Sequence, residues 1–356
     1  MRIGESFSRS VFNLSLPAWR RLRSRYAAAA IPRLLELRFN AAGGMLSALQ
    51  CLQNRLFRDA LHEVSIHRAI FILGHWRSGT TLLHEMLALD DNFISPSTFQ
   101  CFNPQRFLLT GGFGQAEAAR PTGDVVVTSS SPQEEEFALL CLGAVSPYEA
   151  FLFPDALKDL ERLCDPDNFT ADDARAWEAL WMGFLRAVLH AGGADKRLLL
   201  KSPSHSMRVP TLVRLFPDAV FINLSRDPKA VFASTVNMWE TMWDRYALGR
   251  PLKSVELEQC VARIQDAVAA KLRSAGNQIP ADRLVTISYE ELAADPAGTV
   301  AGLYRRLDLG DPARLALRQT DYLAGANARR SQLAPSGKGS GDANSIRFNR
   351  ESRWRA

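Results

Sequence analysis

The sequence predicts an α/β fold in which a mostly parallel central sheet lies between layers of helices. Short apolar segments that suit buried strands alternate with longer segments that have the apolar spacing of helices. Polar residues follow directly after several of the strand segments, as expected where parallel strands end at one edge of a sheet and ligands bind. Such alternation is typical of βαβ units, whose strands are covered by helices on both faces.

Residues 1–68 are predicted to form a helical segment that packs on the core. Arginines between positions 20 and 25 precede a broken apolar face from Ile31 to Leu37, and a second helix is expected from Met45 to Leu61. Basic residues beside an apolar face also suit an anionic membrane surface. Peripheral contact with the inner face of a membrane is therefore a second role open to this segment.

The stretch from residue 69 to residue 84 is expected to organise the sheet. Ala69–Leu73 is predicted to be a strand, which is followed by a polar loop bounded by Gly74 and Gly79 and by a helix that begins at Thr80. The spacing nearly matches the phosphate-binding loop G-x-x-x-x-G-K-[ST]. The sequence therefore predicts a P-loop-like three-layer fold, with backbone N–H groups and the positive end of a helix directed at an anion.

This loop differs from the loop of nucleoside triphosphatases at one position. Thr80 stands where a lysine would reach the β- and γ-phosphates. Arg77 supplies a charge from inside the loop, and its planar guanidinium suits two oxygens of one anion. Together with Ser78, Gly79 and Thr81, these residues predict a site for a phosphate or sulfate group rather than for γ-phosphate cleavage.

Residues 131–136, Ser-Pro-Gln-Glu-Glu-Glu, predict the start of a helix. Ser131 would be the N-cap, Pro132 the first helical residue and Glu134 the partner in a capping box. Two interpretations of the glutamates stay open. They are favourable charges at the positive end of a helix, or Glu134 or Glu135 is a catalytic carboxylate in the cleft.

The remaining elements follow from apolar spacing and capping residues. They are, in order, a short strand at Val125–Thr128, a helix at Thr170–His190, a strand at Arg197–Leu200, a helix at Arg208–Phe216, a strand at Ala219–Leu224, helices at Lys229–Trp239 and Ser254–Asn277, a strand at Leu284–Ser288 and a helix at Pro296–Leu307. The strands at 197–200 and 219–224 lead into Lys201 and Arg226. We expect both cations at the sheet edge where the glycine-bounded loop lies.

Arg226 and Ser234 form a second candidate anion site. If Pro228 opens the following helix, Ser234 lies about two turns into it. The guanidinium and the hydroxyl can then converge on one group of phosphate oxygens.

The segments that contain these motifs resemble the sulfotransferases that use 3′-phosphoadenosine 5′-phosphosulfate (PAPS). The matching stretches are Phe71–Leu83, with its Arg-Ser-Gly-Thr-Thr loop, Leu200–Pro203, and Phe216–Pro228 together with Ser234. The similarity is to the bacterial-type branch, covers residues 69–240 and continues more weakly to residue 307. It implies PAPS as donor, PAP as product and no metal.

The resemblance also implies roles for the motif residues. Residues 77–81 would hold the 5′-phosphosulfate, and Arg226 and Ser234 would hold the 3′-phosphate. A hydroxyl of the acceptor, or less favourably an amine, would attack sulfur in line while a base removes its proton. We expect Arg77 and Lys201 to neutralise charge on the bridging oxygen.

Three kinds of residue are candidates for the base. His205, four residues after Lys201, has an unperturbed pKa of about 6.5. Glu135 and Glu134 follow it closely in our ranking, and His75 inside the loop is the third option. Some branches use a glutamate soon after the loop helix, but residues 92–100 contain none.

The sequence leaves two other functions open, a P-loop kinase and a non-catalytic nucleotide-binding protein. A kinase would want an acidic residue at a strand end to hold Mg²⁺, whereas Lys201 and Arg226 occupy those positions. The apolar segments Cys101–Leu109 and Phe137–Phe153, with the basic N-terminal helices, favour a small or lipid-like acceptor.

The composition suits a cytoplasmic enzyme with an anionic ligand. The 356 residues are 47% hydrophobic and 23% charged, with a net charge of +5 and no nucleic-acid-binding signature. The five cysteines are widely spaced, which favours reduced thiols, and we expect neither a signal peptide nor a membrane span. We expect residues 69–330 to form the α/β domain and residues 331–356 a flexible basic tail.

Overall fold

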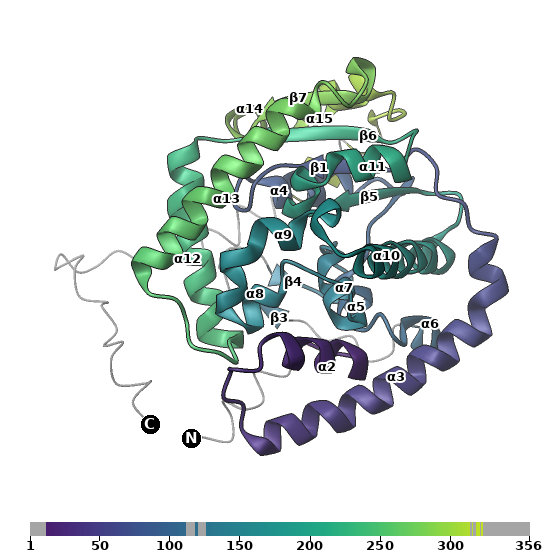
Figure 1. Cartoon of the computed structure of the whole chain (residues 1–356). Coiled ribbons are helices and arrows are strands. Elements are labelled where there is room, and N and C mark those ends of the chain that lie inside the picture. Colours follow the sequence, from purple (N-terminus) through teal and green to yellow (C-terminus); the bar gives the residue numbers. More distant parts are fainter. Residues whose placement is uncertain are drawn as a thin grey trace, which may run out of the picture.

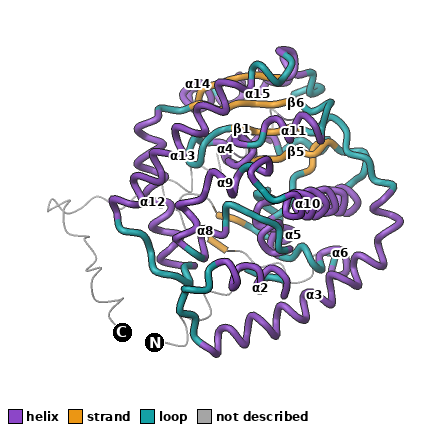
Figure 2. The backbone as a smooth tube through the Cα atoms, viewed as in Figure 1, coloured by secondary structure: helices purple, strands orange, loops and turns teal. Residues whose placement is uncertain are grey.

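A computed structural model of the chain describes residues 12–111, 118–119, 126–313, 315, 318–320 and 322. Its centre is a five-stranded sheet with the order β2-β5-β1-β6-β7, in which every neighbouring pair is parallel. The strands are β1 (Ile70–Leu73), β2 (Phe93–Ile94), β5 (Arg197–Lys201), β6 (Val220–Ser225) and β7 (Leu284–Ser288). Helices cover both faces (Figures 1 and 2), so the predicted α/β fold is confirmed.

Alternate residues of β1 face two different cores, as the two-residue period of a strand requires. Ile70 and Ile72 pack with α4 (Thr80–Leu87), α14 (Tyr289–Ala294) and α15 (Pro296–Leu307). Phe71 and Leu73 pack with the other layer, which includes α10 (Ala171–Gly192) and α11 (Val209–Leu215). Because β1 is buried on both faces, it is uniformly apolar.

A third core lies beside the sheet. It is formed by α2 (Leu16–Arg25), α3 (Arg33–His62), α8 (Glu149–Leu152), α9 (Leu160–Cys164), α12 (Pro228–Tyr246) and α13 (Ser254–Ala275). Trp19 of α2 stacks on Phe39 of α3, and Phe151 of α8 contacts Trp239 of α12. The N-terminal helices therefore share a core with the helices that follow β6.

The expected start of the second N-terminal helix at Met45 was wrong, because α3 is one 30-residue helix that begins at Arg33. Gly43 and Gly44 lie inside this helix. A Cβ at Gly43 would sit 3.0 Å from the backbone nitrogen of Leu16. The glycine therefore marks a close crossing of α2 and α3 rather than the end of a helix.

The helix after the three glutamates also begins later than expected. It is α7 (Glu136–Leu142), and it begins at Glu136 instead of Pro132. The N–H of Gln133 donates to the Pro96 carbonyl at 2.8 Å, and Pro132 forms an isolated antiparallel bridge with Ser97. Residues 131–133 therefore pair with another segment, and Ser131 does not cap the helix.

The shorter elements complete the described part of the chain. They are α5 (Thr98–Phe102), α6 (Phe107–Thr110), β3 (Ala118–Ala119), β4 (Val126–Val127) and four short 3₁₀ turns. β4 confirms the strand expected near Val125–Thr128, and Thr170 caps α10 as expected. The helices described here include none with both the length and the apolar character to cross a bilayer. The expected tail, residues 331–356, lies outside the described residues.

Candidate functional site

The glycine-bounded loop joins the C-terminal end of β1 to α4. As expected, α4 begins at Thr80, and Gly79 precedes it with φ 98°. The N–H of Gly74 donates to the Ser206 hydroxyl at 2.8 Å, and this hydroxyl donates to the Gly74 carbonyl at 3.1 Å. The N–H groups of Thr80 and Thr81, the first two residues of α4, have no acceptor within the helix, whereas that of Leu82 donates to the Gly79 carbonyl. The loop is thus fixed at its base and presents donors at its tip.

Arg77, Ser234 and Arg226 lie together, although they are far apart in the sequence. The Nε of exposed Arg77 donates to the Ser234 hydroxyl at 2.9 Å, and Nη1 of Arg226 donates to the Arg77 carbonyl at 2.9 Å. Arg77 has a left-handed φ of 66°, a strained conformation for a residue other than glycine that is often found at binding sites. The structure therefore brings Arg77 of the loop together with Arg226 and Ser234, the second candidate anion site.

Tyr289 is a member of this site that the sequence analysis missed. The Arg226 guanidinium lies 4.2 Å from the centre of its ring. The ring also covers Gly79, where a Cβ would be 2.3 Å from Cδ2 of Tyr289. Its position directly after β7 was the available signal, because residues after neighbouring parallel strands share one sheet edge.

Lys201 and Glu134 form an ion pair beside the loop. Their side chains are 5% and 14% exposed, respectively. The Lys201 ammonium also donates to the Thr81 hydroxyl at 3.4 Å. The pair places one cation and one carboxylate next to the start of α4, with the carboxylate partly open to solvent.

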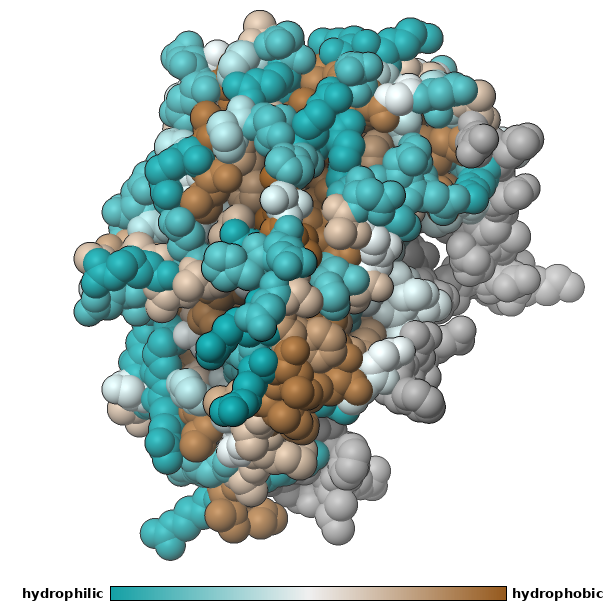
Figure 3. All heavy atoms as spheres, turned by 90° about the vertical axis from the view of Figure 1, so that its right-hand side faces the viewer, coloured by the Kyte–Doolittle hydropathy of each residue, from teal (hydrophilic) through white to brown (hydrophobic). Residues whose placement is uncertain are grey.

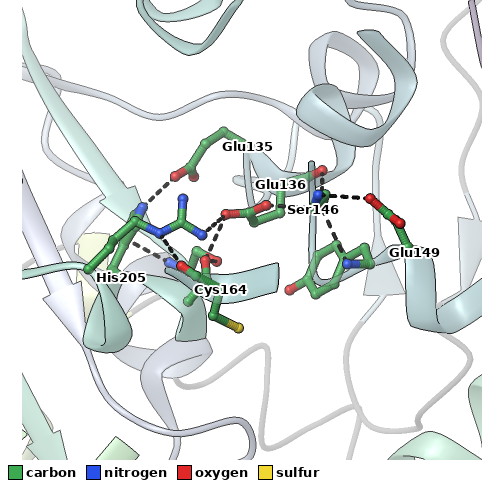
Figure 4. A network of polar contacts seen from close by, with 10 residues as sticks. Glu135, Glu136, Ser146, Glu149, Cys164 and His205 are labelled. Carbon is green, nitrogen blue, oxygen red and sulfur yellow. Dashed lines mark hydrogen bonds and ion pairs between the residues drawn. The ribbon is translucent and has the colours of Figure 1, made fainter. Parts of the chain in front are cut away.

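His205 and Glu135 form a second pair, which is entirely buried (Figure 4). Nε2 of His205 lies 2.5 Å from Oε1 of Glu135, and its Nδ1 accepts the N–H of Ser202 at 3.3 Å. Burial alone raises the pKa of the Glu135 carboxyl, but interaction with His205 outweighs it and holds this pKa below its usual range. Both ring nitrogens of His205 are thus engaged inside the protein.

This burial changes the comparison of the candidate bases. A base must come within hydrogen-bond reach of the proton that it removes. His205 and Glu135 are enclosed, whereas Glu134 is partly exposed. His75 lies in the loop with Nδ1 donating to the Trp76 carbonyl at 2.8 Å, and burial lowers its pKa. The geometry therefore favours Glu134, which our ranking by sequence placed after His205 and Glu135 and before His75.

The pair also predicts a pH dependence of stability. A carboxyl whose pKa is lowered by folding stabilises the protein fully above its unfolded pKa of about 4.3, and this contribution is lost as the pH falls through the lowered value. In Glu135→Gln, the free energy of unfolding should therefore decrease less below about pH 4 than in the wild type. Denaturant titrations across this range measure it. Equal decreases in both proteins would contradict the prediction, and Glu161→Gln, at an exposed ion pair, is the control.

Within the described ranges, no cluster of three or more histidine, cysteine, aspartate or glutamate side chains is arranged to hold a metal ion. The five cysteines are all free thiols, and four of them are buried.

Comparisons with known proteins place the chain among relatives. A model described as "Sulfotransferase family" matches residues 69–312. The omega-hydroxy-beta-dihydromenaquinone-9 sulfotransferases Stf3 of Mycobacterium bovis and Mycobacterium tuberculosis are each 31% identical over 315 residues, which is 86% of this chain and 80% of theirs.

Two solved structures share the fold along nearly the whole chain. Sulfotransferase STF1 from Mycobacterium tuberculosis matches with a TM-score of 0.63 at 20% identity, over 94% of this chain and 93% of its own. Sulfotransferase STF9 from Mycobacterium avium matches with a TM-score of 0.63 at 18% identity, over 93% and 91%.

Proposed function

The chain belongs to the sulfotransferase family, and we propose that the loop of residues 74–81, with the ends of β5 and β6, is the site at which it transfers a sulfuryl group from PAPS. The observation that supports this site is the convergence of Arg77, Arg226 and Ser234 on a loop without the P-loop lysine. The family membership decides against the P-loop kinase considered above. The released product is PAP.

The residues divide the donor between two subsites. Arg77, Ser78 and the N–H groups of Gly79, Thr80 and Thr81 would hold the 5′-phosphosulfate, and Arg226 and Ser234 the 3′-phosphate. The Arg77 side chain borders both subsites, because its Nε donates to the Ser234 hydroxyl at 2.9 Å. Guanidinium groups and helix N-termini suit these anions because both present several N–H donors. The cation–π contact with Tyr289 limits the movement of the Arg226 guanidinium.

In the transfer step, the acceptor oxygen forms a bond to sulfur while the bond from sulfur to the phosphate oxygen breaks. Lys201 stabilises the negative charge that grows on the leaving oxygen. Glu134 accepts the proton of the acceptor hydroxyl, and we prefer it to His205 because of its exposure. His205 and Glu135 are buried next to Glu134 and have no contact with the reacting atoms in this proposal.

We propose a lipid-like alcohol as the acceptor. The support is the Stf3 relatives, whose name specifies omega-hydroxy-beta-dihydromenaquinone-9. The segments Cys101–Leu109 and Phe137–Phe153 lend less support than expected, because many of their apolar side chains belong to the buried core. Incubating the enzyme with PAPS and either a hydroxylated isoprenoid quinone or a short alcohol, followed by mass spectrometry, tests this. A sulfuryl group gained only by the short alcohol would contradict the proposal.

The donor site makes a prediction for Gly79→Ala. Its φ of 98° and its contact with Tyr289 both oppose a side chain, so PAP affinity should fall about tenfold or more through strain and a displaced Tyr289. Calorimetric titration with PAP measures this. Gly111→Ala is the matched control, since Gly111 also has a positive φ but nothing within 4 Å of the added Cβ. Equal PAP affinity in both variants would refute the prediction.

We also propose that α3 provides peripheral membrane contact. Its exposed large apolar residues are Leu34, Leu37, Met45, Leu52 and Leu56. At about 100° per residue they share one side of the helix, away from buried Leu35, Phe39 and Leu46. Figure 3, which faces the side where α3 runs, shows apolar surface beside hydrophilic surface in its lower half. Exposed arginines, Arg33, Arg38, Arg55 and Arg58, suit anionic lipids.

The double variant Leu52→Glu/Leu56→Glu should bind vesicles of mixed anionic and neutral phospholipid with an affinity at least about tenfold lower than that of the wild type. It loses two apolar side chains and gains two negative charges, which the anionic lipids repel. Co-sedimentation measures the bound fraction. Val255→Glu, at another exposed apolar residue but on α13, should bind like the wild type. Vesicle binding unaffected by the double variant would contradict the proposal. The proposal would also be contradicted if the wild type were a dimer and the double variant a monomer, because this face of α3 would then contact a second copy of the chain.

A further inference from the structure

Three consecutive glutamates pair with three basic side chains, one at the end of β5 and two in the segment that follows it. Glu134 pairs with Lys201, Glu135 with His205, and Glu136 with Arg208. The outermost pair is beside the loop and partly exposed. The inner two pairs are no more than 1% exposed, so neither donor nor acceptor reaches them in this structure.

Glu136 lies at the centre of an enclosed network (Figure 4). Its Oε1 accepts from Arg208 at 2.5 Å and from the Ser204 hydroxyl at 2.7 Å, and its Oε2 accepts from the Ser146 hydroxyl at 3.0 Å. Nε of Arg208 donates to the Cys164 carbonyl at 3.0 Å, which holds the guanidinium from its other side. The network therefore joins the start of α7 to the residues after β5 through several directed bonds.

Forming a buried ion pair of this kind costs desolvation free energy, because both charges leave water. Desolvation offsets much of the attraction between the charges, so such a pair is weak evidence for stability, whereas its directed bonds can select one geometry. Here the geometry that is selected is the alignment of residues 134–136 with residues 201–208. If this alignment slipped by one residue, Glu134 would no longer face Lys201 at the loop.

We propose that Glu135, His205, Glu136 and Arg208 are positioning residues for sulfuryl transfer. They fix the Glu134 carboxylate and the Lys201 ammonium beside the loop without touching donor or acceptor. The proposal rests on the proposed function, in which Glu134 and Lys201 act on the reacting atoms. It assigns His205 a role different from that of the base.

Glu135→Gln is the first test, because it removes the negative charge that pairs with His205 and changes the size of the side chain little. We expect kcat to fall about tenfold to a hundredfold through misplacement of Glu134 and Lys201. The affinity for PAP should stay within about twofold. The decline of kcat towards acidic pH should remain, since Glu134 is still the base. The double variant Glu135→Gln/His205→Gln should lose no more activity than the stronger single variant, because both residues act through one pair.

Glu149→Gln is the matched control. Glu149 is also fully buried and is joined to the same network, because it accepts the N–H of Ser146. Its ion pairs, however, are with Arg21 and Arg25 of α2. This variant should unfold at a lower temperature but retain wild-type kcat.

Two results with Glu135→Gln would overturn the proposal. A wild-type kcat in a less stable variant would mean that the pair is only structural. Loss of the decline towards acidic pH would mean that Glu135 is itself the base. The proposed function would fail separately, if Glu134→Gln and Lys201→Met both turned over like the wild type. Arg208→Lys should recover activity relative to Arg208→Met if the charge at Glu136 sets the alignment.

Discussion

Replacing Lys201 by methionine is expected to lower kcat by about 10²–10³, the usual effect of removing one group that stabilises developing negative charge. The ammonium is nearly buried between Glu134 and Thr81. Methionine retains most of the length of the side chain but cannot interact with the leaving oxygen. The affinity for PAP should change far less than kcat, because Arg77, Arg226 and Ser234 remain.

Steady-state kinetics with PAPS, combined with calorimetric titration of PAP, measures these two effects. Lys196→Met is the matched control, because Lys196 directly precedes β5 and therefore lies at the other end of the same strand. It should keep wild-type kcat. If PAP affinity fell as strongly as kcat in Lys201→Met, Lys201 would be a binding residue rather than a stabiliser of the transition state.

Replacing Glu134 by glutamine is expected to lower kcat by about 10²–10⁴, the range for loss of a general base. A carboxylate works as a base only when it is deprotonated, so wild-type kcat should decline at acidic pH. This decline should be absent from the residual activity of the variant. The pH profile of kcat, measured with saturating PAPS, tests both statements.

Glu161→Gln, in an exposed ion pair with Arg263, provides the control for a general loss of negative charge. A variant at Glu134 that kept the acidic decline and most of its activity would return His205 to consideration as the base. His205 would then have to become accessible, which requires opening of its packing against Phe71 and Trp181.

Much of the sheet could be predicted from the sequence. β7 and α15 have the predicted bounds, and β1, β5 and β6 lie within about one residue of them. β1, β5 and β6 are mostly buried, and all of these strands lie between well-marked helix starts, so a local pattern is enough to locate them. The loop was also predictable, because Gly74, Arg77 and Gly79 stand at a spacing tied to a known backbone geometry.

Properties that depend on tertiary packing were harder to predict from the sequence. Nothing near His205 in the sequence indicates that its ring is fully buried against Glu135. The capping pattern at residues 131–134 was lost to pairing with residues 96–99, because a contact with a distant segment replaced a local one. Tyr289 was missed because its role depends on β7 lying beside β6.

The order of the strands has a consequence for how this enzyme matures. β1 pairs with β5 and β6, which follow it more than a hundred residues later, so the central pairings are non-local and should form slowly. Residues of the donor site come from the ends of β1, β6 and β7, and Lys201 and Glu134 meet only after β5 has joined β1. A nascent chain therefore cannot assemble the site until synthesis has passed Tyr289. In a refolding experiment, the return of sulfuryl-transfer activity would report the last step of sheet assembly.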